Sequence, residues 1–323
     1  MRKFAIRWAA VFLILGLTTQ SVSAARFLIP VGQVIGLQIR EDSVSVEGFD
    51  ETLGVPAQTA GLKTGDRILQ IDDTPIHCAQ DIRQALRQSD GEVDVQILRG
   101  STKKQLQIQP SITSDGPKLG IFLREGITGV GTVTYYDPQS GCFGALGHGV
   151  SDKDGTAVQM TDGLAYRAIV DSVRKGESGD PGQLSGSITD PTPFATLSKN
   201  TVQGVFGQTA AAFSGDELPV AEDIHQVQPG PATIRSTVQG NTVQEYSVEI
   251  LKIYPSSSSA GRNLLLQVTD PALLAATGGI VQGMSGSPII QDGKLVGAVT
   301  HVLVNDPTRG YGIFIENMLD AAG

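Results

Sequence analysis

Apolar residues along this chain come in short runs that alternate with polar positions, and Gly, Asp or Pro separates one run from the next. The runs at 93–98 and 105–108 have a period of two, which predicts two strands of a hairpin around residues 99–104. Helical spacing is rarer and predicts one clear helix over residues 79–86. This pattern of many short strands and few helices indicates a mainly β protein.

The same pattern divides the chain into a small module and a larger domain. Residues 27–110 predict a succession of helix, turn, strand, helix and hairpin, which fits one compact α+β module. The polar stretch 111–117 contains Gly116 and Pro117 and predicts a linker. Short strands dominate again from 118 to 323, so we expect a separate all-β domain there.

The first residues predict an export signal. Arg2, Lys3 and Arg7 precede an apolar stretch, and Ala24 ends a run of small residues of the kind that a signal peptidase cleaves. The apolar stretch is shorter than the about 20 residues of a membrane span. We therefore expect residues 1–25 to be a cleaved signal and the protein to be exported. An uncleaved signal anchor stays open, and it would hold the protein peripherally at the membrane.

Composition excludes several classes of function. Aromatic residues make up 5% of the 323-residue chain and glycines number 39, which fits short strands joined by tight turns. With a net charge of -9 and a pI near 4.9, the chain lacks the basic field that captures nucleic acid. Cys78 and Cys142 fall in different predicted domains and are expected to be unpaired. No residue pattern indicates a metal or a cofactor, and His77 is interpreted as a solvent-facing or capping residue.

The strongest candidate for chemistry is a serine held between glycines. The run GMSGSP at 283–288 precedes strand-like apolar residues, and its glycines allow a sharp turn that approaches a bound substrate closely. In such a turn the amides of Gly283 and Ser285 would converge on one point and form an oxyanion hole. The alternative is a Gly/Ser-rich hairpin without chemistry.

A histidine at the end of a short apolar run is the candidate base. His148 is flanked by glycines, and the ordinary histidine pKa of about 6.5 suits the transfer of a proton near neutrality. His301 is the rival base, because it follows Ser285 by 16 positions (301 − 285). We interpret the strand that carries it, with Thr300, His301 and Val302, as part of a substrate pocket.

The candidate acid is Asp270. It ends an apolar strand and precedes Pro271, which stops strand pairing there. An aspartate that accepts a hydrogen bond from the far nitrogen of the imidazole selects the tautomer that the reaction needs. The competitors nearer to His148 in sequence also fit solvated turn carboxylates; they are Asp152, Asp154, Asp162 and Asp171.

The small module resembles the bacterial PDZ domain, above all in the run AGLKTGDRILQID at 60–72. In that family a peptide C-terminus adds as a strand to the domain, and backbone amides hold its carboxylate. The resemblance implies a peptide-binding loop and strand and a facing helix. The residues concerned are Ile35, Gly36, Leu37 and Ile39 for the loop and strand, and Ile82 and Leu86 for the helix. The alternative is that their side chains only fill the core.

The chain from this module to its end resembles the stage IV sporulation protein B family of endospore-forming bacteria. The similarity rests on GALGH at 144–148, VTDP at 268–271, GGIVQGMSGSPII at 278–290 and GAVTHVLVNDPT at 297–308. It implies an N-terminal PDZ domain followed by a trypsin-like serine endopeptidase with a double β-barrel. His148, Asp270 and Ser285 would then be its base, acid and nucleophile.

The resemblance also implies a place and partners. Members of this family act in the space between mother cell and forespore, process themselves near the N-terminus, and cleave a membrane-embedded regulator of sigma-factor activation. We therefore expect protein substrates, possible self-cleavage, and a PDZ domain that controls recognition. Two other functions stay open: a secreted PDZ scaffold whose barrels have no catalysis, and a serine esterase, although the nucleophile of esterases sits between a strand and a helix.

Overall fold

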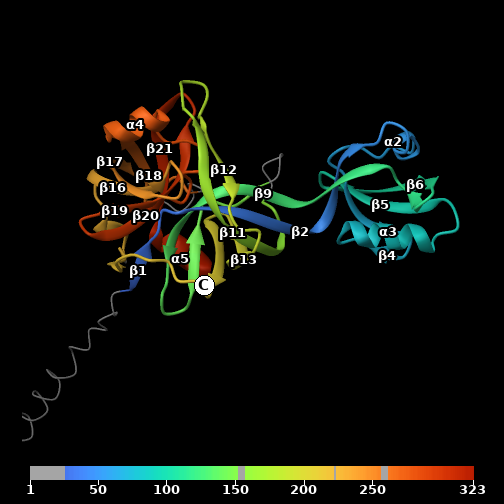
Figure 1. The fold of residues 1–323 in the computed structure, drawn as a ribbon, viewed down its shortest axis with the longest axis horizontal. Helices are drawn as coiled ribbons and strands as arrows, with labels where there is room; N and C mark the ends of the chain where they lie inside the picture. Colours follow the sequence, from blue (N-terminus) through green and yellow to red (C-terminus); the bar gives the residue numbers. More distant parts are fainter. Residues whose placement is uncertain (1–25, 152–156, 222, 256–260) are drawn as a thin grey trace, which may run out of the picture.

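The computed structural model describes residues 26–151, 157–221, 223–255 and 261–323. The predicted export signal lies outside the described residues, as do Asp152 and Asp154. The described chain forms a small lobe and a larger lobe of two barrels, and two long strands join them (Figure 1). Strands dominate both lobes, so the predicted mainly β fold with a double barrel is confirmed.

Six strands close into the first barrel through the pairing of its two longest members. In order around the barrel these are β2 (Val34–Phe49), β9 (Ile121–Tyr136), β10 (Cys142–Ala145), β14 (Gly204–Thr209), β13 (Ala195–Thr201) and β11 (Met160–Arg174). Three further strands add to it: β1 (Phe27–Pro30), β15 (Leu218–Pro219) and β12 (Gln183–Ile188). Inward-facing apolar residues of alternating positions, such as Ile35, Leu37 and Ile39, fill its interior.

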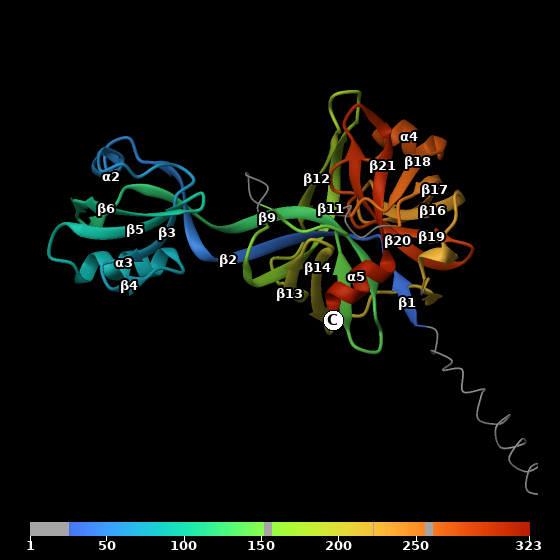
Figure 2. The ribbon, with the colours of Figure 1, turned by 180° about the vertical axis from the view of Figure 1, so that it is seen from behind.

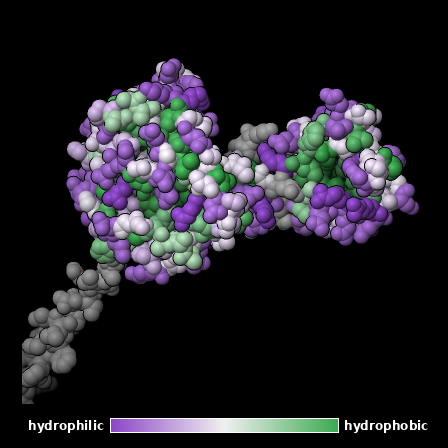
Figure 3. All heavy atoms as spheres, in the orientation of Figure 1, coloured by the Kyte–Doolittle hydropathy of each residue, from purple (hydrophilic) through white to green (hydrophobic). Residues whose placement is uncertain are grey.

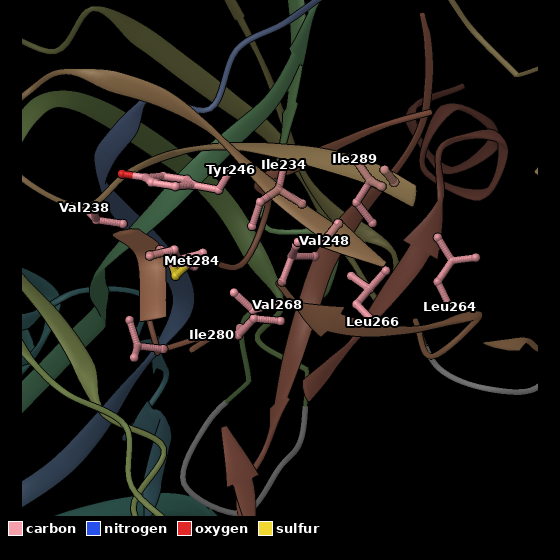
Figure 4. Close-up of a cluster of buried hydrophobic side chains, with 14 of the residues drawn as sticks. Ile234, Val238, Tyr246, Val248, Leu264, Leu266, Val268, Ile280, Met284 and Ile289 are labelled. Atoms are coloured by element: carbon pink, nitrogen blue, oxygen red, sulfur yellow. The ribbon is translucent and has the colours of Figure 1, made fainter. Parts of the chain in front are cut away.

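The second barrel is built from the C-terminal part of the chain. Its strands in order are β16 (Gly230–Thr237), β17 (Val243–Ile253), β18 (Leu264–Val268), β21 (Asp306–Phe314), β20 (Lys294–Leu303) and β19 (Pro288–Gln291). Ile234, Val248, Leu266 and Ile289 come from four of these strands and belong to one buried cluster (Figure 4). The short helices η1 (Ile224–Gln226) and α4 (Pro271–Thr277) lie in its connections.

A cluster of buried apolar residues from both barrels holds the two barrels together. Leu28 and Tyr135 from the first barrel side are buried together with Leu295 and Ile313 of the second. Met318 of the last helix, α5 (Ile315–Ala322), completes the cluster. The two barrels therefore share a hydrophobic core where they meet, and this core holds together the two sides of the site described below.

The small lobe has its own core between a helix and a sheet. Its elements are α2 (Val55–Thr59), β3 (Arg67–Ile71), β4 (Thr74–Pro75), α3 (Ala79–Gln88), β5 (Val93–Arg99), β6 (Thr102–Ile108), β7 (Ser111–Thr113) and β8 (Gly116–Lys118). Asp66 is buried beneath them and accepts two hydrogen bonds of 2.7 Å from Arg99. Both cysteines are free, as expected, and Cys78 caps the start of α3.

The structure corrects the predicted domain borders. β2 and β9 each run through both lobes: Ile35 to Arg40 pair with β9 inside the barrel, whereas Ser45 to Phe49 pair with it inside the small lobe. The small lobe thus comprises residues 44–123 and is inserted into the first barrel, which also contains residues 27–40. The predicted linker at 111–117 is largely the β7–β8 hairpin. The apolar alternation of β2 is interrupted at the polar residues 40–43, and its pairing with β9 shifts register there, yet the strand itself continues from the barrel into the small lobe.

Both lobes present hydrophilic residues over much of the face in Figure 3, with hydrophobic residues visible between them. Among the described residues, no helix is long and apolar enough to cross a membrane.

Candidate active site

A cavity of about 720 Å³ lies where the two barrels meet. The first barrel contributes apolar side chains of β2 and β9, including Leu37, Ile39 and Ile127, and the segment that carries His148. The second barrel contributes the turn with Ser285 and the predicted pocket residues Thr300, His301 and Val302 on β20. The structure therefore brings the predicted nucleophile, base and pocket residues into one cavity.

The turn that presents Ser285 requires glycine at two positions. Gly283 and Gly286 have φ angles of +100° and +98°, a region that L side chains rarely adopt. A Cβ on Gly286 would also lie 2.0 Å from the carbonyl oxygen of Thr132. The glycines that the sequence places around Ser285 thus serve a tight turn packed against β9.

Two amides of this turn are free to bind a ligand. The N–H groups of Met284, Gly286 and Ser287 donate to the carbonyls of Val281, Val299 and Met284 at 2.7–3.1 Å. Within the described part of the chain, the N–H groups of Gly283 and Ser285 donate to no acceptor. Since backbone amides in folded proteins are almost always paired, two unpaired amides beside a serine hydroxyl fit the predicted oxyanion hole.

The hydroxyl of Ser285 points to a backbone carbonyl in this structure. Its Oγ donates to the carbonyl oxygen of Thr300 at 2.7 Å. Thr300 also lies close to the chain before His148, because a Cβ on Gly147 would stand 2.9 Å from its Cγ2. Ser285 and His148 therefore line the same cavity, and Thr300 lies next to the segments that carry them.

His148 is held in the tautomer that a general base needs. Its Nδ1 lies 2.9 Å from the carbonyl oxygen of Gly149, and since a carbonyl only accepts, Nδ1 must donate and Nε2 keeps a lone pair. Asn200 fixes this segment by accepting from the N–H of Val150 and donating to its carbonyl. Burial lowers the pKa of His148 below the usual 6.5, although the hydrogen bond to Gly149 opposes the shift. The ring is thus neutral at neutral pH.

His301, the rival base, lies beside His148 with 5.1 Å between the ring centroids. Burial, with the nearby His148 and Arg262, lowers the pKa of His301 to about 4. Its Nδ1 is buried and has no hydrogen-bond partner in the described chain, so nothing there selects its tautomer. The geometry favours His148 as the base and leaves His301 as a neutral wall of the cavity.

The structure does not bring Asp270 to His148. Asp270 is the N-cap of α4: its Oδ1 accepts from the N–H groups of Ala272 and Leu273 at 2.9 and 3.0 Å. Its Oδ2 accepts from the N–H of Ser247 at 3.3 Å. The assignment of Asp270 as the orienting acid is therefore corrected, because Pro271 starts a helix whose free amides occupy the carboxylate.

The described competitors do not replace it. Asp162 forms an exposed ion pair with Arg40, and Asp171 accepts from the hydroxyl of Ser187. Among the residues that the structure describes, the His148 ring forms one hydrogen bond, to the carbonyl of Gly149. In the described chain, a backbone carbonyl therefore takes the orienting place that the sequence assigned to an aspartate.

The predicted peptide-binding strand of the small module also lies elsewhere. Ile35, Gly36, Leu37 and Ile39 sit in the first barrel, where β9 pairs with one edge of their strand and β11 with the other. No edge remains there to which a peptide could add, so this assignment is corrected. Ile82 and Leu86 lie on α3, buried in the core of the small lobe.

The small lobe does have an open strand edge, at the start of β9. Residues 121–124 pair with β2 on one side only, and Ile121 and Leu123 pack on the cluster that contains Ile82 and Leu86 of α3. The preceding Leu119 and Gly120 have N–H groups without an acceptor in the described chain. The sequence analysis did not identify this edge, although the run KLGIF at 118–122 places a glycine between apolar residues directly before a strand.

Comparisons with known proteins agree with this architecture. The family model described as SpoIVB peptidase S55 matches residues 115–319, and the PDZ domain model matches residues 34–109. No curated protein matches the chain.

Among solved structures, the PDZ domain of the SdrC-like protein Lmo2051 from Listeria monocytogenes is 26% identical, with a TM-score of 0.22, over 25% of this chain and 87% of that one. The active form of the Rv3671c protease from M. tuberculosis is 15% identical, with a TM-score of 0.36, over 62% of this chain and 73% of that one. Its inactive form is 14% identical, with a TM-score of 0.34, over 61% of this chain and 85% of that one. These scores are too low to carry an inference.

Proposed function

The chain belongs to the SpoIVB peptidase S55 family and is a serine peptidase with a PDZ domain, and we propose that Ser285 is its nucleophile and His148 its general base. The observation that carries this proposal is that the amides of Gly283 and Ser285 have no acceptor among the described residues and lie beside a serine hydroxyl in the cavity that also holds His148. Hydrolysis of an internal peptide bond of a protein substrate is the reaction that this arrangement supports.

The reaction begins when the Ser285 hydroxyl turns from the carbonyl of Thr300 to Nε2 of His148. Nε2 takes the proton while Oγ attacks the peptide carbonyl, and the amides of Gly283 and Ser285 bind the oxyanion. The imidazolium then gives its proton to the leaving amine, and a water molecule hydrolyses the acyl-enzyme in the same way. The carbonyl of Gly149 holds the ring throughout.

The site of action and the substrate are proposals that the resemblance to the family supports. We propose that the protein is exported to the space between mother cell and forespore, processes itself near the N-terminus, and cleaves a membrane-embedded regulator of sigma-factor activation. The basic and apolar N-terminal residues support export. The apolar walls of the cavity, with Leu37, Ile280 and Val302 among them, support an extended, uncharged substrate segment.

The PDZ domain is proposed to control recognition by binding a peptide end at the open edge of residues 121–124. The same strand, β9, runs from the small lobe into the first barrel (Figure 2). There Ile127 and Val130 line the catalytic cavity. A peptide added to this edge would act on the strand that also reaches the active site. This continuity supports control of the peptidase by the PDZ ligand.

The test compares Ser285→Ala with Ser287→Ala in the full chain. Ser287 is a matched control, because its hydroxyl is buried in the same turn and bonds to Ser236 at 3.0 Å. A fluorophosphonate probe should label the wild type and Ser287→Ala but not Ser285→Ala, and new N-termini found by mass spectrometry should follow the labelling. Cleavage that persists in Ser285→Ala would refute the nucleophile.

The same assay separates the alternatives. A secreted scaffold would bind peptides and show no labelling at all. A serine esterase would be labelled at Ser285 and hydrolyse ester substrates, yet leave proteins uncut.

A further inference from the structure

One residue of β9 contacts both halves of the catalytic site. Thr132 is fully buried, and its Oγ1 donates to the carbonyl of Gly283 at 2.8 Å while its N–H donates to the carbonyl of Ser285 at 3.0 Å. Its own carbonyl accepts from the N–H of Leu146, two residues before His148, at 3.2 Å. On the basis of the proposed function, we propose that Thr132 is a positioning residue that sets the oxyanion hole.

The hydroxyl of Thr132 fixes the peptide plane next to the Gly283 amide. That plane carries the carbonyl of Gly283, held by Thr132, and the N–H of Met284, held by the carbonyl of Val281 at 3.1 Å. The peptide plane between Ser285 and Gly286 is held in the same way. Its carbonyl, that of Ser285, accepts from the Thr132 N–H, and its N–H, that of Gly286, donates to the carbonyl of Val299 at 2.7 Å. Each of the two peptide planes that flank the Met284–Ser285 peptide is therefore fixed by one hydrogen bond at its carbonyl and one at its N–H.

These hydrogen bonds are needed because residue 283 is a glycine. Gly283 has no side chain to restrict its rotation, and at φ +100° it occupies a region open to glycine in several orientations. Without the Thr132 hydroxyl, the part-buried Gly283 carbonyl loses this partner, and the freed peptide plane between Gly283 and Met284 no longer fixes the adjoining planes that carry the Gly283 and Ser285 amides of the oxyanion hole. The hydroxyl therefore acts on catalysis through the backbone and does not touch the substrate.

The contact with Leu146 extends this role to the base. Leu146 and Gly147 lead directly into His148, and a Cβ on Gly286 would lie 2.6 Å from the Leu146 nitrogen. Thr132 thus stands between the nucleophile turn and the segment of the base. Its strand is also the one whose start forms the open edge of the PDZ domain.

The test replaces the hydroxyl by a methyl group of nearly the same size. Thr132→Val should lower kcat about tenfold to a hundredfold, less than the loss of a whole oxyanion donor, and should leave KM within about threefold. Thr132→Ser should recover most of kcat, because it keeps the hydroxyl. A peptide aldehyde, which binds as a tetrahedral adduct, should lose affinity for Thr132→Val in parallel with kcat.

Thr134→Val is the matched control. Thr134 lies two residues along β9, is equally buried, and has a hydroxyl without a hydrogen-bond partner in the described chain. Its replacement should change kcat by less than about twofold, since no hydrogen bond is lost. Circular dichroism and thermal unfolding would confirm that all variants are folded at the assay temperature.

The outcomes distinguish this inference from the proposed function. If Thr132→Val keeps wild-type kcat while Ser285→Ala is inactive, the inference fails and the function stands. Equal losses in Thr132→Val and Thr132→Ser, or a loss confined to KM, would show a packing role and overturn the inference as well. If Ser285→Ala remains active, the proposed function itself fails.

Discussion

Substitution of Asp270 separates two roles that this carboxylate has in sequence and in structure. As the orienting acid of a triad, Asp270 would control kcat, and Asp270→Asn would lower kcat about 10⁴-fold through the wrong tautomer of the base. As the N-cap of α4, it accepts from the amides of Ala272 and Leu273. Asparagine caps a helix about as well as aspartate, so Asp270→Asn should leave kcat within a few-fold of the wild type.

The magnitude for Asp270→Ala follows from the same contacts. Alanine removes an acceptor from two helix amides and from the N–H of Ser247. Loss of an N-cap costs about 1 kcal/mol, which lowers the Tm of a domain of this size by about 2–4 °C. Peptide hydrolysis at saturating substrate and thermal unfolding would be measured on both variants. A large loss of kcat in Asp270→Asn with an unchanged Tm would refute the structural assignment.

Three further predictions concern titration and the small lobe. Because burial lowers the pKa of His148, the fall of kcat/KM at acid pH should have its midpoint below pH 6.5, and a midpoint at or above 6.5 would contradict this. His301 has a pKa of about 4 in the folded chain, so the unfolded chain binds the proton first as the pH falls. The free energy of unfolding should therefore decrease by about 1–2 kcal/mol between about pH 6.5 and 4, after allowance for the partial exposure of His301. Urea unfolding of His301→Gln should show a smaller loss, while the exposed His225→Gln should behave as the wild type. Asp66→Ala should destabilise the small lobe, because it removes a buried acceptor from Arg99 and from the N–H of Lys63; faster hydrogen exchange confined to that lobe would show it, and unchanged exchange would contradict it.

Local features were predictable wherever a short run of sequence sufficed. The glycines around Ser285 indicated a sharp turn because only glycine adopts positive φ there without strain. The period of two predicted strands correctly, and the helical spacing at 79–86 located α3. These conclusions depend on neighbours in the chain, and they needed no knowledge of the fold.

Errors arose where two local interpretations competed. An aspartate before a proline ends a strand and also caps a helix, and only the position of α4 decided that Asp270 does the latter. The segment with Ile35 and Leu37 alternates as a strand in either lobe, and only its pairing with β9 and β11 placed it in the barrel. Thr132 gave no signal at all, because a threonine in a strand is ordinary.

The sequence by itself indicated the residues that we propose for the chemistry, a serine in a glycine turn and a histidine after a strand, and a PDZ-like module in the same chain. The tertiary structure alone decided what holds them in place. The Thr132 hydroxyl holds a carbonyl that lies 151 residues away in the chain, that of Gly283, and β9 reaches both lobes through its pairing with β2, a strand from a distant part of the chain. Such pairings are fixed by the closure of the barrels, for which no short stretch of sequence contains the information.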